Sequence, residues 1–273
     1  MDDYTRHLFS YLPPSRLTTW SCGHIIPSSN LIALPLAQGP SAIPFDFTYS
    51  NRASRTLLTA LGNTFITLAT CIPDGIVIFF PSYAYLDLVT QHLKTTNIWP
   101  RLQALKPIFL ESKSSTTDTL LADYSLSIST NRGGILLSVI GGKLSEGINF
   151  SDALGRGVIV VGLPFPNIHS AQWKAKLEYV EQATVKKGGS REEGKASARE
   201  FYENACMRAV NQCIGRAIRH KGDYAAIVLL DGRYGTSRIE GKLPGWIKEG
   251  VVRGEGFRGV EGKLRGFFEG KGR

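Results

Sequence analysis

The sequence has no run of about 18 apolar residues, the length that a membrane-spanning helix needs, so no membrane contact is expected. Its first residues, MDDYTRHLFSYLPP, start acidic and lack an apolar core segment, so they do not predict a signal peptide. Cysteine is scarce, and none of the four forms a C-x-x-C pair: Cys22, Cys71, Cys206 and Cys213. No histidine cluster accompanies them, so the sequence predicts no metal site and fits a reducing, intracellular setting.

Acidic residues are in the minority, since 23 Asp and Glu stand against 32 Lys and Arg in 273 residues, a net charge of +9. This excess of positive charge favours an anionic partner, but it carries no information about the fold. The sequence also places no acid–base or nucleophile constellation near its predicted strand ends, which argues against a small-molecule α/β enzyme.

Apolar runs of strand length alternate with helix-like segments along most of the chain. Continuous runs such as GIVIFF and AAIVLL are typical of strands buried on both faces. The alternation predicts an α/β fold, a parallel sheet with helices on both faces. The predicted strands are 45–49, 75–80, 107–110, 135–140, 158–163 and 225–230, and the predicted helices are 51–70, 83–94, 118–128 and 170–187. Residues 186–199 are predicted to be a mobile loop, and the glycine-rich tail from residue 235 weak helix at best.

The stretch 204–234 is predicted to contain a helix that stops at Gly222, a tight connection and a buried strand. It carries the pattern Q-x-x-G-R-x-x-R at Gln212, Arg216 and Arg219. On a helix these residues lie three to four apart and share one face. Two guanidiniums and an amide on one face suit a polyphosphate, because each guanidinium is a rigid, always charged fork of donors. The alternative interpretation is a solvated basic face near a helix C-terminus.

A glycine pair follows the predicted strand 135–140, in the segment GGKLSEGINF at 141–150. Glycines after a parallel strand let the backbone approach an anion closely. In this interpretation Ser145 donates to a phosphate, and Glu146 accepts from a ribose hydroxyl or orients an arginine. The alternative is an ordinary glycine-rich turn between a strand and a helix.

Three of these segments occur in the order seen in one family. GKLSEGINF at 142–150 resembles motif V of the XPD-like superfamily 2 DNA helicases, and QCIGRAIR at 212–219 resembles their motif VI. VIFFPSY at 77–83 is similar to motif IV. Segments 21–27, 162–167 and 229–234 are most similar to the chromosome-loss branch, whose members act in sister-chromatid cohesion. The resemblance runs from about Cys22 to Trp246.

The resemblance implies a RecA-like fold, the second of two motor domains of a nuclear, ATP-dependent 5′-3′ DNA helicase that serves chromosome cohesion and DNA repair. By position, Arg219 resembles the arginine finger, Arg216 its companion at the γ-phosphate, and Gln212 the polar residue beside it. The resemblance further implies that Gly142, Glu146 and Gly147 bind the nucleotide. It implies that the residues near DNA are Ser82, Tyr83, Lys143, Ser145 and Asn149.

The family's first motor domain carries parts that this sequence lacks, namely a Walker A lysine loop, an Asp-Glu-Ala-His box and the cysteines of an iron–sulfur cluster. We therefore expect a C-terminal fragment that is inactive alone, with ATP and Mg²⁺ held mainly by the missing domain. Expected partners are single-stranded or forked DNA, that domain, and cohesion or replication factors. The alternative function is a non-catalytic module that binds nucleic acid or a protein partner.

The expected organisation has three parts. Residues 1–50 are predicted to be an incoming segment and linker from the missing domain, and 51–248 the RecA-like domain. Residues 249–273 are predicted to be a flexible tail rich in Gly, Arg and Lys.

Overall fold

The computed structural model describes residues 5, 9, 11–20, 23, 25–112, 117–147, 150–253 and 256–271. They fall into two compact units. The smaller unit comprises residues 1–24 and 165–208, and the larger comprises 25–164 and 209–273.

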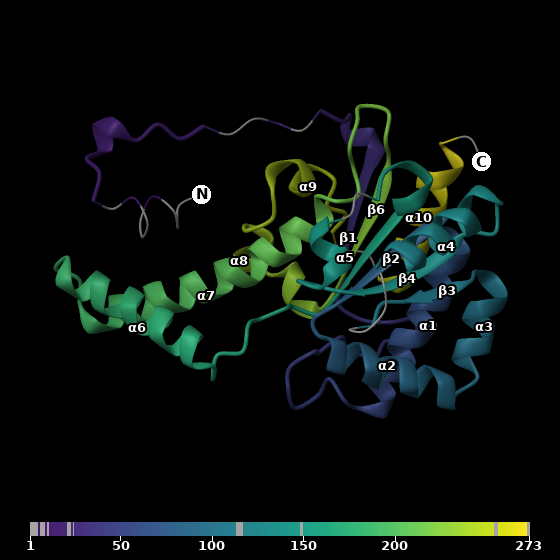
Figure 1. Cartoon of the computed structure of the whole chain (residues 1–273), viewed down its shortest axis with the longest axis horizontal. Helices are drawn as coiled ribbons and strands as arrows, with labels where there is room; N and C mark the ends of the chain where they lie inside the picture. The colour runs from purple at the N-terminus through teal and green to yellow at the C-terminus, as the bar shows by residue number, and fades with distance from the viewer. Residues whose placement is uncertain are drawn as a thin grey trace. The chain divides into compact units, whose positions relative to one another are not determined.

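The larger unit is built on a six-stranded, all-parallel sheet in the order β1-β6-β5-β2-β4-β3 (Figure 1). The strands are β1 (Leu31–Leu36), β2 (Gly75–Phe80), β3 (Ile108–Leu110), β4 (Gly134–Val139), β5 (Gly157–Val161) and β6 (Ala225–Leu230). Every residue of β2, β4, β5 and β6 is buried. Their continuous apolar runs are therefore explained by helices on both sides, and the predicted fold class is confirmed.

One face of the sheet is covered by four helices: α1 (Arg55–Cys71), α2 (Tyr83–Thr95), α3 (Ile98–Leu105) and α10 (Phe257–Glu269). The other face is covered in part by α4 (Thr117–Ser129), whose Tyr124 ring meets Phe109 of β3 at 5.5 Å. Phe79 of β2 also points to this second face, where its ring lies 6.3 Å from that of Phe150. Short helices complete the unit: α5 (Lys143–Gly147), α8 (Ser237–Glu240) and α9 (Gly245–Glu249).

The smaller unit contains α6 (Ala171–Lys186) and the first part of α7 (Arg191–Ile214), up to Arg208. The Trp173 ring lies 5.7 Å from Tyr202 and 6.2 Å from Phe201. The predicted mobile loop at 186–199 is wrong, because α7 begins at Arg191. The Ser190 N–H donates to Glu193 and the Glu193 N–H donates to Ser190, which is the reciprocal capping box of a helix start.

Two predictions about the edges of the domain were wrong. The segment 1–50 is not a linker throughout, because β1 at Leu31–Leu36 pairs in parallel with β6. Residues 45–49 form no strand, because the Asp46 carboxylate accepts from the Thr48 N–H at 3.0 Å and from Asn51, which folds this segment into a turn.

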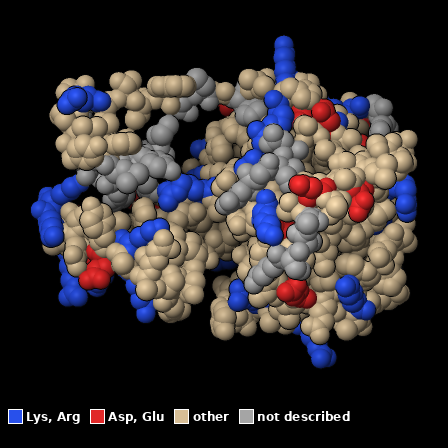
Figure 2. Space-filling model, viewed as in Figure 1, with Lys and Arg blue, Asp and Glu red and all other residues tan. Residues whose placement is uncertain are grey.

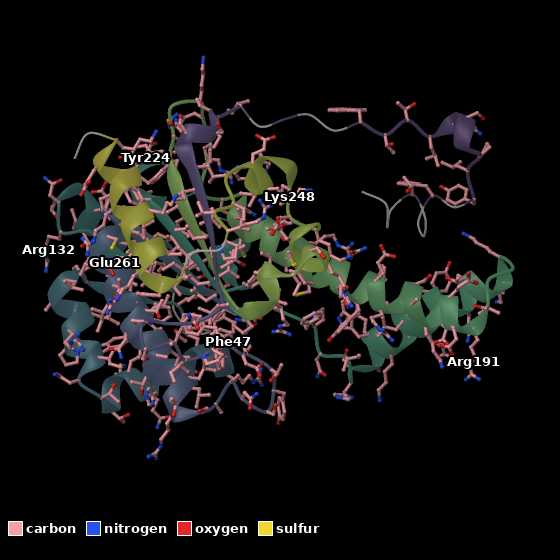
Figure 3. The ribbon with its side chains drawn as sticks, turned by 180° about the vertical axis from the view of Figure 1, so that it is seen from behind. Phe47, Arg132, Arg191, Tyr224, Lys248 and Glu261 are labelled. Carbon is pink, nitrogen blue, oxygen red and sulfur yellow. The ribbon has the colours of Figure 1, made fainter. Side chains whose placement is uncertain are left out.

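The glycine-rich tail contains a full helix, α10, where only weak helix was predicted. Its apolar residues Phe257, Val260, Leu264 and Phe268 recur at helical spacing and are all buried. Gly262 and Gly266 lie on its exposed side, where a Cβ would meet no atom within 4 Å. Figure 3 shows the molecule from behind, where α10 carries the labelled Glu261 and lies close to Tyr224. Burial of one apolar face therefore outweighs the low helix propensity of glycine.

Among the described residues, no helix is both long enough and apolar enough to span a membrane.

Candidate nucleotide and nucleic-acid site

The predicted site residues do not all lie at one edge of the sheet. Ser82 and Tyr83 follow β2, and Gly142 and Lys143 follow β4, so this group lies at the carboxyl ends of the strands. The Arg219 backbone is bonded to Asp223, two residues before β6, and therefore lies toward the amino ends. Arg216 instead meets the end of the motif V segment, through the Phe150 N–H.

The arginine pattern does not lie on one helical face, which corrects the prediction. Helix α7 ends at Ile214, so Gln212 lies on its last turn and both arginines lie in the following loop. The chain leaves the helix at Gly215. The Arg216 and Ala217 N–H groups then donate to the carbonyls three residues earlier, those of Cys213 and Ile214, as in a 3-10 turn. Ala217 and Ile218 continue the apolar spacing of the helix, but they are buried in this loop. Gly222 therefore does not end the helix.

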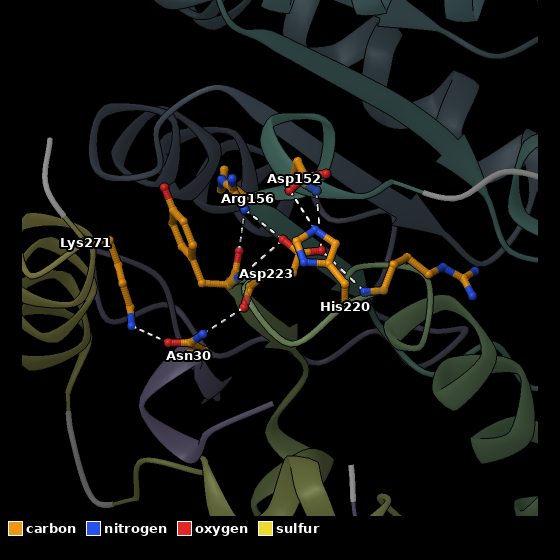
Figure 4. A network of polar contacts seen from close by, with 8 residues as sticks. Asn30, Asp152, Arg156, His220, Asp223 and Lys271 are labelled. Atoms are coloured by element: carbon orange, nitrogen blue, oxygen red, sulfur yellow. Dashed lines mark hydrogen bonds and ion pairs between the residues drawn. The ribbon is translucent and has the colours of Figure 1, made fainter. Parts of the chain in front are cut away.

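The loop 215–224 carries both arginines and is called the arginine loop. It is anchored by Asp223, a fully buried carboxylate two residues before β6 (Figure 4). Its oxygens accept from the Arg156 guanidinium at 2.9 Å and from the Arg219 backbone N–H at 3.3 Å. They also accept from the N–H groups of Asp152 and Tyr224, at 3.3 and 2.9 Å. One carboxylate thus fixes the backbone of Arg219 relative to the segment before β5.

Arg156, the side-chain partner of Asp223, also has several contacts that fix its position. The Arg156 side chain is almost fully buried, donates to the Tyr224 carbonyl, and lies over the Tyr224 ring at 3.7 Å. The Tyr224 ring in turn contacts Phe267 and Phe268 of α10. The C-terminal helix therefore supports the base of the arginine loop.

A second set of contacts joins the arginine loop to the end of the motif V segment. The Arg216 carbonyl accepts from the Phe150 N–H at 3.1 Å, and His220 lies 2.9 Å from the Asp152 carboxylate. Possible metal ligand atoms of Asp152, His220 and Asp223 lie within 4.8 Å of one another. The Asp223 carboxylate already has four protein donors and Asp152 has His220, so these groups are explained as an anchor for the loop.

At the carboxyl edge, two residues predicted to lie near DNA also have structural contacts. Ser82 is the N-cap of α2, where its hydroxyl accepts from the Tyr85 N–H at 3.2 Å. The Tyr83 hydroxyl donates to the buried Glu111 carboxylate at 2.7 Å. Burial, together with that hydrogen bond, raises the pKa of Tyr83 to about 12, so it stays a donor at neutral pH.

In the turn after β4, Gly142 is buried, Lys143 is exposed, and the buried Ser145 hydroxyl donates to the Gly142 carbonyl at 3.0 Å. This contact closes the turn and turns the hydroxyl inward. Glu146 and Gly147 belong to the last turn of α5, and Asn149 lies outside the described residues. The roles assigned to these residues remain predictions.

Three buried charged residues of the site are absent from the sequence-based set: Glu111, Arg156 and Asp223. A charged residue within two positions of a predicted strand is the signal that indicates each, because such positions need a partner. The sequence does not reveal which partners meet, since Arg156 and Asp223 are 67 residues apart.

Residues 65–250 match the family model of the helicase C-terminal domain. The chain belongs to the helicase C-terminal domain family. This helicase domain extends beyond the matched range, because α10 at Phe257–Glu269 completes its core.

The domain is similar to curated proteins named ATP-dependent DNA helicase chl1. It is 54% identical over 268 residues to that of Aspergillus clavatus, covering 93% of this chain and 36% of the relative. It is 46% identical over 273 residues to that of Schizosaccharomyces pombe, covering 99% of this chain and 32% of the relative. The chain thus spans about a third of the length of these relatives.

Solved structures show the same fold. An XPD helicase superposes with a TM-score of 0.54 at 22% identity, covering 78% of this chain and 33% of that one. S. cerevisiae Dbp5 bound to RNA and ADP BeF3 gives 0.50 at 11% identity, covering 98% of this chain and 52% of that one. The predicted RecA-like architecture is confirmed by these likenesses.

Proposed function

We propose that this chain is the C-terminal motor domain of a nuclear ATP-dependent 5′-3′ DNA helicase that acts in chromosome cohesion and DNA repair. The names of the curated relatives support the activity. The observation that carries the proposal is the arginine loop, whose backbone is fixed by Asp223 and joined to the motif V segment at Phe150. Partners of the domain are DNA, an N-terminal motor domain, and cohesion or replication factors.

The donor set of the loop fits the outer phosphates of ATP. Arg219 is exposed, Arg216 is half-buried, and Gln212 on the adjoining helical turn is exposed. Bound ATP would supply the phosphoryl group, and two guanidiniums are suited to oxygens on which negative charge shifts. The nearby carboxylates of Asp223 and Asp152 already hold protein donors, so a magnesium ion would take its ligands from the N-terminal domain. We assign the family's iron–sulfur cluster to that domain as well.

The domain alone is expected to bind single-stranded DNA weakly and with little dependence on base sequence. The net charge of +9 favours contacts with the phosphate backbone, and Figure 2 shows lysine and arginine side chains spread over one face among fewer acidic ones. Affinity should fall by about tenfold between about 50 and 200 mM salt, as measured by fluorescence anisotropy with a labelled oligonucleotide. Binding that does not change over this range would contradict the proposal.

The domain alone is also expected to show no ATPase activity. Hydrolysis requires a phosphate-cradling loop, a magnesium carboxylate and a group that orients water, which we assign to the N-terminal motor domain. The measurement is phosphate release by the purified chain, with and without single-stranded DNA. Hydrolysis stimulated by DNA would show that the chain is a complete motor. DNA binding with no ATPase activity after fusion to an N-terminal motor domain would favour the non-catalytic module.

A further inference from the structure

Glu111 is a buried carboxylate that follows β3 directly and is only 2% exposed. Its oxygens accept from the hydroxyls of Tyr83 and Ser138, both at 2.7 Å. They also accept from the backbone N–H groups of Val139 at 3.0 Å and Leu144 at 3.4 Å. Four donors therefore surround a single charged group inside the larger unit.

These donors come from three separate parts of the chain. Tyr83 opens α2 after β2, Ser138 and Val139 end β4, and Leu144 lies in the first turn of α5. The Glu111 backbone N–H adds a bond to the Leu137 carbonyl at 2.9 Å. Hydrogen bonds to a buried charge are strong and directional, so Glu111 fixes these segments relative to one another.

Gly142 shows how closely the turn after β4 fits this carboxylate. A Cβ on Gly142 would lie 2.7 Å from Glu111 Oε1 and 2.9 Å from Tyr83 Oη. The neighbouring Gly141 differs, since its φ of 72° requires glycine while a Cβ there would meet nothing within 4 Å. The absent side chain at Gly142 thus makes room for the Tyr83–Glu111 pair, whereas the sequence-based interpretation was the close approach of an anion.

We propose that Glu111 is a positioning residue that sets the turn 141–145 and, through it, the exposed Lys143 against the segment after β2. This inference rests on the proposed function, because Lys143 is assigned a contact with the DNA backbone there. Glu111 itself is buried inside the domain, so it would affect DNA binding only through the turn that it holds. The two effects of Glu111 on DNA affinity therefore have opposite signs: its placement of the turn raises the affinity, whereas its negative charge lowers it.

The direction in which Glu111→Gln changes the DNA affinity therefore distinguishes the two effects. Glu111→Gln removes one negative charge, which by electrostatics alone would raise the affinity for DNA. A positioning role predicts the reverse, a loss on the order of tenfold, because one phosphate contact is displaced. Both affinities are measured on the whole chain at low salt, with the same labelled single-stranded oligonucleotide.

Asp123→Asn is the matched control, because Asp123 is an exposed acid on α4 and its replacement removes the same charge. It should leave the affinity unchanged or slightly higher. Tyr83→Phe removes one donor and leaves the carboxylate in place, so a smaller loss in the same direction is expected. If the glutamine variant fails to fold, the hydrogen exchange of the turn in Tyr83→Phe decides the question, because Tyr83 is itself predicted to lie near DNA and its affinity change would have two causes.

Amide hydrogen exchange of residues 142–145 provides a readout that needs no DNA. Faster exchange there in Glu111→Gln and in Tyr83→Phe, but not in Asp123→Asn, is the expected result. Unchanged exchange, or DNA affinity that rises in Glu111→Gln, overturns the positioning role. A parent chain that binds no DNA would reject the proposed function, while the exchange rates would still decide whether Glu111 holds the turn.

Discussion

Replacing Arg219 by lysine, in a helicase that joins this domain to its N-terminal motor domain, is expected to lower ATP turnover by about a hundredfold or more. Nucleotide affinity should change much less, because the guanidinium contributes most as negative charge shifts during phosphoryl transfer. Lysine keeps the positive charge but loses the planar fork of donors. The measurements are steady-state ATPase rates and the binding of a fluorescent nucleotide.

Arg219→Lys should leave the fold of the domain intact. The Arg219 contact with Asp223 is made by its backbone N–H, so lysine retains the anchor of the loop. The side chain is exposed, so the change leaves no cavity in the core. DNA affinity without nucleotide should hardly change, since Arg219 lies toward the amino ends of the strands and the predicted DNA residues follow their carboxyl ends.

Arg208→Lys is the control for Arg219→Lys. Arg208 is an exposed arginine earlier on α7, and its guanidinium lies 5.7 Å from the centre of the Phe201 ring. It stands outside the Q-x-x-G-R-x-x-R pattern, so its replacement should leave turnover nearly unchanged. Equal, small effects of both substitutions would favour the alternative interpretation, a solvated basic surface.

The central sheet could be predicted from the sequence because burial on both faces leaves a continuous apolar run. The bounds of β2 (Gly75–Phe80) and β6 (Ala225–Leu230) agree with the prediction residue for residue. β1 is an apolar run of the same kind, but its place in the sheet depends on pairing with β6, almost 200 residues away. Such long-range pairing leaves no local pattern, and therefore the domain boundary at residue 51 was wrong.

The site was less predictable because its geometry depends on where α7 ends. Ala217 and Ile218 extend the helical apolar spacing past Gly215, so periodicity alone favours a longer helix. The chain turns instead, because Asp223 and Phe150 provide partners for the backbone of the loop. The residue types of the pattern pointed to a polyphosphate site, while the arrangement of its side chains required knowledge of contacts with distant segments.

Asp223→Ala is expected to lower the free energy of unfolding of the larger unit by about 3–5 kcal/mol. The substitution leaves the guanidinium of Arg156, a residue only 8% exposed, without its carboxylate, and it removes the acceptor of three backbone N–H groups. Since a whole domain is stable by about 5–15 kcal/mol, this is a large share. Asp223→Asn keeps the shape and one acceptor oxygen, so a smaller loss is expected. Urea denaturation followed by circular dichroism measures both.

The origin of that loss can be tested by removing both members of the pair. If the cost comes from an uncompensated buried charge, adding Arg156→Met to Asp223→Asn should recover part of the stability, although the contact with the Tyr224 ring is lost. Glu192→Ala breaks the exposed pair with Lys195 and should leave the unfolding midpoint nearly unchanged. Equal midpoints for Asp223→Ala and Glu192→Ala would contradict the anchoring role of Asp223. An additive loss in the double variant would assign the cost to the backbone donors of the arginine loop. In a helicase that joins this domain to its N-terminal motor domain, the rate of ATP turnover should then fall as well.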